Sequence, residues 1–188
     1  MDKTFITQQA LKFKKTRSNL LAVVAFTAIN LILIAFNAGF YFPFSATAPG
    51  LIFEVGRGMA EELQRNVFLI AGLIIAFIVV ALYFVCWLLT KRLRGFILAA
   101  LILFSLDSLM FLAIVFAAGF EISYLLDIAF HGWVLFYLIN GVVAWAKLRG
   151  VNADDFNAAL EPSAPAEINQ PPSESLGDQT ATDNETIS

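Results

Sequence analysis

The 188-residue sequence holds one cysteine, one histidine and few charges, since only 14% of its residues are Asp, Glu, Lys or Arg. A single cysteine excludes an intrachain disulfide scaffold and a zinc site built from cysteines. A single histidine excludes a metal cage of several histidines, and nothing indicates a cofactor. The motifs GxSxG, HExxH, CxxC and GxxxxGK[ST] are absent, so no motif points to a hydrolase, a metalloprotease, a thiol oxidoreductase or a nucleotide-binding enzyme.

Hydrophobic residues are abundant: they make up 59% of the chain, and the mean hydropathy is +0.76. Soluble domains are about 45–50% apolar and about 25% charged. Four apolar stretches reach the roughly 20 residues that a membrane-spanning helix needs. Their backbone groups must be paired within the segment, which favours helices, and the alternation typical of a β-barrel is missing. The sequence predicts an all-α, integral membrane four-helix transmembrane bundle with spans at residues 19–42, 67–90, 96–120 and 122–146.

Basic residues lie mostly on one side of these spans. Five Lys or Arg precede the first span, three separate the second from the third, and two follow the fourth. Only Arg57 and Arg65 lie in the connection between the first two spans. The positive-inside rule therefore predicts both termini in the cytoplasm, with a basic N-terminal segment over residues 1–18. The first apolar run is longer than the core of a signal peptide, which favours a span over a cleaved leader.

Two regions lie outside the spans. The outer loop, residues 43–66, contains helix-breaking Pro and Gly, an apolar part able to dip into the interface, and residues 59–66, which are predicted to extend the second span outward. We expect a packed cap or, alternatively, a ligand lid or a partner surface. Residues 150–188 hold eight acidic residues and no Lys or Arg, and predict a disordered acidic tail, either solvating or docking a basic partner.

Three ionisable residues lie inside the predicted spans, where such groups are costly and suggest function. Asp107 is in the third span, and Asp127 and His131 are in the fourth. An antiparallel hairpin turning near residues 119–120 places Asp107 level with His131, where the two can share a proton or form an ion pair. Tyr124 and Asp127 continue the polar stripe on one face of the helix. The spacing of Asp127 and His131 suits a metal, but two ligands do not define a site.

The first span carries a matching stripe, because Asn30 and Asn37 fall on one helical face and Asn30 lies near the middle of the membrane. The predicted intramembrane polar cluster comprises Asp107, His131, Asp127, Asn30, Tyr124 and Asn37. Such side chains also serve as hydrogen-bonding groups between helices or within an oligomer interface, without meeting any substrate.

The segment from SNLL at residues 18–21 to INL at residues 29–31, followed by YFPFSA at residues 41–46, resembles small uncharacterised four-helix bacterial membrane proteins. The resemblance covers roughly the first quarter of the chain. It implies a bacterial plasma membrane and carries over no active site.

Three functions are compatible with these features. The first is a non-enzymatic membrane protein that acts by association with a protein partner or a second copy, as an accessory, scaffold or immunity-type protein. The second is a small oligomeric transporter or proton-coupled carrier that uses Asp107 and His131. The third is a membrane enzyme on a lipid-linked or peptide substrate, with His131 and Asp127 as acid and base. The basic clusters flank spans, so the lipid bilayer explains them better than nucleic acid does.

Overall fold

The computed structural model describes residues 2–40, 42 and 45–160, and all regular secondary structure within these residues is helical. The helices, in chain order, are α1 (Lys3–Ala35), α2 (Ala48–Glu62), α3 (Val67–Leu89), α4 (Phe96–Ala118), α5 (Tyr124–Lys147) and α6 (Ala153–Ala158). Among these, α1, α3, α4 and α5 are long and apolar enough to cross a membrane. The predictions of an all-helical protein and of four candidate spans are therefore confirmed.

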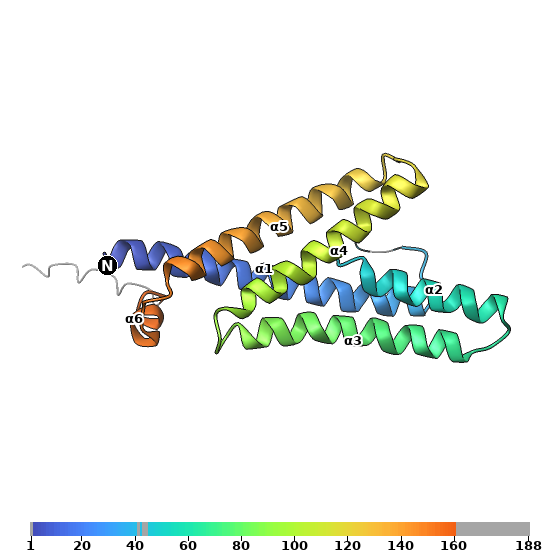
Figure 1. Ribbon diagram of the computed structural model, residues 1–188, viewed down its shortest axis with the longest axis horizontal. Helices are drawn as coiled ribbons and strands as arrows, with labels where there is room; N and C mark the ends of the chain where they lie inside the picture. Colours follow the sequence, from blue (N-terminus) through green and yellow to red (C-terminus); the bar gives the residue numbers. More distant parts are fainter. Residues whose placement is uncertain (1, 41, 43–44, 161–188) are drawn as a thin grey trace, which may run out of the picture.

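The spanning helices form two groups (Figure 1). Helices α1, α2 and α3 lie side by side, while the α4–α5 hairpin diverges from them toward its turn. The hairpin turn contains Gly119 with a φ of +94°, a conformation that favours glycine. At the other end of the bundle, α6 lies near the N-terminus of α1. The candidate site lies where this hairpin meets the start of α2.

Helix α1 differs from the predicted first span at both ends. It begins at Lys3, where the side chain of Asp2 accepts the N–H of Thr4 at 3.3 Å, so the basic segment is helical and continuous with the span. It ends at Ala35, and residues 36–40 lie outside the helix. The predicted helical span to residue 42 is therefore wrong, because the chain turns soon after Ala35.

Helix α2 was not predicted as a separate element. Residues 59–62 belong to its last turn, so the prediction that residues 59–66 extend the second span is wrong. The chain reverses after α2 at Gln64, whose φ is +54°. Helix α2 then packs along α3 at Gly56 and Gly72, where a Cβ on Gly56 would lie only 2.9 Å from the Cα of Gly72. This contact between two helix backbones requires glycine.

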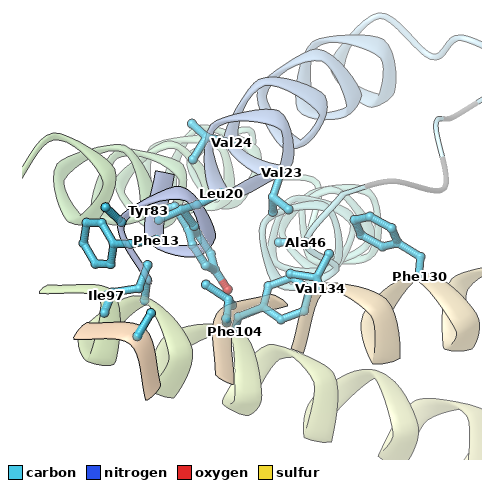
Figure 2. Close-up of a cluster of buried hydrophobic side chains, with 14 of the residues drawn as sticks. Phe13, Leu20, Val23, Val24, Ala46, Tyr83, Ile97, Phe104, Phe130 and Val134 are labelled. Carbon is cyan, nitrogen blue, oxygen red and sulfur yellow. The ribbon is translucent and has the colours of Figure 1, made fainter. Parts of the chain in front are cut away.

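The core lies where α1 crosses the other spanning helices (Figure 2). Its largest side chains that are almost fully buried are Phe13 and Leu20 of α1, Tyr83 of α3, and Phe104 of α4, all at most 2% exposed. Helix α1 approaches α5 at Gly141, where a Cβ would lie 2.5 Å from Cγ2 of Thr16. Many large apolar residues on the outer faces of the helices are exposed, as expected of surfaces that contact lipid.

The predicted disordered tail begins too early. Helix α6 begins at Ala153, soon after the end of α5 at Lys147, and Phe156 is buried with its ring 6.0 Å from that of Phe13, edge to face. The guanidinium of Arg94 lies 4.1 Å above the Phe156 ring. One aromatic residue and its cationic partner thus order the first part of this segment, although acidic residues surround it. Residues 161–188 lie outside the described residues.

Candidate functional site

Asp107 of α4 and His131 of α5 are in contact. They lie level with one another in the hairpin, as the sequence predicted. Nε2 of His131 lies 3.2 Å from Oδ2 of Asp107, and the two residues are 4% and 3% exposed. The imidazole is stacked between the rings of Phe104 and Phe111, with centroids 5.3 and 4.7 Å away. The pair is therefore enclosed by apolar side chains, where an unpaired charge would be very costly.

The carboxyl group of Asp107 also binds the start of α2. Oδ1 accepts the N–H of Ala48 at 2.7 Å, and Oδ2 accepts the N–H of Thr47 at 3.0 Å. The first N–H groups of a helix have no partner within it, and this end carries a partial positive charge. The Thr47 side chain does not cap α2. Asp107 therefore supplies, from a different helix, the acceptors and the negative charge that this N-terminus needs.

His131 has polar partners at both ring nitrogens. Nδ1 lies 2.8 Å from the main-chain oxygen of Asp127, which can only accept, so Nδ1 carries a hydrogen. Nε2 lies 3.2 Å from Oδ2 of Asp107 and 3.5 Å from Oγ1 of Thr47. The carboxyl group of Asp107 thus contacts the imidazole and two main-chain N–H groups at once.

Asn30 binds the segment that leads into α2, here called the link segment (Phe42 and residues 45–47). Its amide nitrogen donates to the carbonyl oxygen of Phe42 at 2.5 Å and to Oγ of Ser45 at 2.7 Å. Its amide oxygen accepts the N–H of Phe42 at 2.7 Å. Asn30 is 6% exposed. One buried amide on α1 thus satisfies both backbone groups of Phe42, which has no helix to pair them.

Thr27, one turn before Asn30 on α1, holds the middle of the link segment. Its hydroxyl oxygen accepts the N–H of Ala46 at 2.9 Å, and the hydroxyl donates to the carbonyl oxygen of Val23 at 2.7 Å. Both Thr27 and Ala46 are buried. Non-helical backbone at membrane depth is tolerated only where protein groups satisfy it. For the link segment, side chains of α1 and α4 together supply these hydrogen-bond partners.

The sequence offered only a partial signal for this arrangement. Asp107, His131 and Asn30 stand out because polar groups are rare in spans. Thr27 and Thr47 do not, since threonine is common in transmembrane helices and loops. Pro49 near the N-terminus of α2 is the one local indication that a helix starts after Thr47. Which distant side chain caps that helix depends on tertiary packing.

Asp127 and Tyr124 lie near the Asp107–His131 pair but are not part of it. Asp127 is buried in the first turn of α5, and Tyr124 is half-buried with its ring against that of Phe111. Both line a cavity of about 290 Å³ between the α4–α5 hairpin and the start of α2, which Asn30 and Thr47 also line. His131 is not among the residues lining this cavity.

Asn37 lies apart from the predicted cluster. It is exposed, has a φ of +55°, and accepts a hydrogen bond from Arg57 at 3.5 Å. The stripe that joined it to Asn30 assumed a helix through residue 42, and the helix ends at Ala35. Grouping Asn37 with the intramembrane residues was therefore wrong.

Tyr83 is a buried polar residue that the sequence reasoning did not single out. It is 1% exposed, and its hydroxyl oxygen has no hydrogen-bond partner among the described residues. Figure 2 shows it within the apolar cluster with Phe13 and Phe104. A buried phenol without a partner has no periodic or local sequence signature, because any tyrosine in a span can instead reach the interface.

Comparison with known proteins adds no functional assignment, since no protein family, curated protein or solved structure matches the chain. The resemblance to small bacterial membrane proteins therefore stays a sequence-based expectation. Within residues 2–40, 42 and 45–160, no group of three His, Cys, Asp or Glu side chains is placed to hold a metal ion. The geometry of the polar residues is what remains for inferring function.

Proposed function

We propose that this protein acts by association with other membrane components, as an accessory, scaffold or immunity-type protein, rather than by chemistry at its buried polar residues. One observation carries the proposal. Asp107 and His131 are engaged by protein groups at each of their polar atoms: Oδ1 and Oδ2 bind the start of α2, and Nδ1 and Nε2 bind Asp127 and Asp107. Their arrangement supports a role in holding α2 in place.

The surface that suits a protein partner lies at the far end of α2. A hollow of about 1090 Å³ is formed there by the end of α1, α2 and the start of α3. It combines apolar Phe53 and Leu73 with the ion pair of Glu54 and Arg57. Mixed apolar and charged lining is typical of protein interfaces, whereas acyl chains favour purely apolar surfaces.

Site-specific photo-crosslinking tests association at this surface. A photoreactive residue at Leu73, inside the hollow, should give adducts of discrete mass in native membranes. The matched control is Phe77, one turn further along α3 and 66% exposed, where only lipid adducts are expected. The mass separates a second copy from a different protein. Absence of protein adducts at Leu73, together with a monomeric species after extraction, would contradict the proposal.

The orientation also belongs to the proposal. Most basic residues lie at one end of the bundle, in residues 3–17, in the α3–α4 connection and near the end of α5. This distribution supports placing both termini in the cytoplasm. The chain would then sit in a bacterial plasma membrane, with α2 and the hollow on the outer side. Labelling of single cysteines introduced at Gly58 and at Lys14 with a membrane-impermeant reagent tests this: only the Gly58 position should react in intact cells.

A proton-coupled carrier is the second candidate, favoured by the contact between Asp107 and His131 and by the nearby cavity of about 290 Å³. In that function, Asp107→Asn should abolish proton uptake in proteoliposomes while the protein stays folded. If stability falls together with any activity, the variant supports the structural role instead. The membrane-enzyme hypothesis finds less support, because His131 does not line the cavity from which a substrate would approach.

A further inference from the structure

The opposite end of the bundle has a second hollow, of about 720 Å³, where α4 begins and α5 ends. Three arginines line it, and no acidic side chain does; its members are Arg92, Leu93, Arg94, Gly95, Phe96, Leu98, Ala99, Ile102, Trp145, Leu148 and Arg149. None of these residues takes part in the Asp107–His131 pair or in the hollow beside α2. The site is therefore separate from the proposed association surface.

The arginines divide into one fixed and two available side chains. Arg94 is half-buried: it stacks on Phe156 and donates to the carbonyl oxygen of Val151 at 3.3 Å. Its partial burial lowers the pKa of the guanidinium from its ordinary value, because desolvation disfavours the cation. Arg92 and Arg149 are exposed. Arg149 lies over the ring of Trp145, but stacking uses the face of a guanidinium and not its N–H groups, so both side chains can pair with a ligand of negative charge.

The rest of the hollow is apolar and continues along α4 toward the membrane interior. Leu98 and Ile102, one turn apart, are 40% and 55% exposed, and the small Ala99 lines the hollow beside them. Trp145 closes the other side, and Arg149 lies 4.9 Å above its ring. Tryptophan and arginine above an apolar trough are typical of the boundary between headgroups and acyl chains.

We propose that this hollow binds an anionic phospholipid, with the phosphate between Arg92 and Arg149 and one acyl chain along Leu98, Ala99 and Ile102. Charge complementarity supports an anion, because the lining carries only positive charge. The apolar trough distinguishes a lipid from a soluble phosphate, since a free anion gains nothing from Leu98 and Ile102. Guanidinium groups pair with phosphate oxygens in a bidentate geometry, which favours arginine for this contact. The proposed lipid binding does not depend on which side of the membrane this end of the bundle faces.

Lipid binding is measured on the full-length protein in detergent by native mass spectrometry, with phosphatidylglycerol, phosphatidylcholine and inorganic phosphate as separate additions. We expect phosphatidylglycerol to bind well above phosphatidylcholine. The double variant Arg92→Gln/Arg149→Gln should weaken it roughly 30-fold, at about 1 kcal/mol per basic residue. The matched control, Lys12→Gln/Lys14→Gln, removes the same charge from exposed positions of α1 and should retain binding.

Three results would overturn the proposal: equal losses in the two double variants, equal binding of the two lipids, or saturable binding of inorganic phosphate to the hollow. If the arginine variant does not fold, Ala99→Phe keeps all charges and blocks the trough. Phosphatidylglycerol binding should then fall at least tenfold. Unchanged binding by Ala99→Phe would show that no acyl chain lies there.

Discussion

The two ends of the bundle hold non-helical backbone by different means. Near α2, the link segment is deep among the helices, and short buried side chains of α1 and α4 pair its N–H and C=O groups. At the other end, one side chain pairs with the backbone after α5, where Arg94 donates to the carbonyl oxygen of Val151, and the segment is otherwise held by Phe156, whose ring packs against Arg94 and Phe13. The difference follows from water: deep in the bundle every backbone group needs a protein partner, whereas near the surface water serves instead.

We expect the largest loss of stability when the carboxyl group at the start of α2 is removed. Asp107→Ala leaves Nε2 of His131 without the carboxyl group and leaves two N–H groups at the start of α2 unpaired, and should destabilise the protein by about 3–5 kcal/mol. Thermal unfolding in detergent measures the loss. Asp107→Asn, which keeps one acceptor oxygen, should lose less. Equal stability of Asp107→Ala and the wild type would show that the contact does not hold α2.

The packing of α2 on α3 is expected to give the next largest effect. In Gly56→Ala the new Cβ would lie 2.7 Å from the carbonyl oxygen of Phe68, which is backbone and cannot rotate away. Forcing the helices apart should cost about 1–3 kcal/mol. Gly58→Ala, in the same helix with nothing within 4 Å of the new Cβ, is the control and should be neutral or slightly stabilising. Similar losses from both variants would contradict the close approach.

The link segment can be destabilised by a substitution that leaves Asp107 and His131 unchanged. Asn30→Ala removes three hydrogen bonds, leaves the N–H of Phe42 unpaired and leaves its carbonyl oxygen only the 3.4 Å contact with Oγ of Ser45, for a loss of about 1–3 kcal/mol. A cysteine introduced at Ser45 should then react faster with a soluble maleimide. Asn37→Gly removes an exposed amide just after the end of the same helix, at a φ of +55° that glycine tolerates, and should change neither stability nor labelling. If the cysteine at position 45 reacts with maleimide no faster in the Asn30→Ala variant, Asn30 does not hold the link segment.

The smallest effect is expected at the opposite end. Phe156→Ala removes the cation–aromatic pair, worth about 0.5–1 kcal/mol, and the buried surface of a ring that packs on Phe13; the loss is limited because α6 can unfold locally. The change should be local: amide hydrogen exchange should quicken in α6, and the unfolding temperature should hardly move. A large drop in global stability would show that α6 supports the bundle, and the contrast between the two ends would then fail.

The sequence predicted the candidate pair more fully than its surroundings. The meeting of Asp107 and His131 follows from helix rise and a short hairpin, both local quantities. Helix α2 was missed because its apolar residues share a loop with prolines and glycines that also suit irregular structure. Asn37 was misplaced for a related reason: periodicity assigns a face only while the helix continues, and the end of α1 has no proline to announce it.

Composition and apolar length alone determined that the chain is helical and carries four segments able to cross a membrane, because lipid leaves a polypeptide few ways to pair its backbone. Only the tertiary structure decided what the buried acid does. The partners of Asp107 are main-chain N–H groups of Thr47 and Ala48. Every residue except proline carries such a group, so no side-chain pattern distinguishes these two until the fold brings them to the carboxylate.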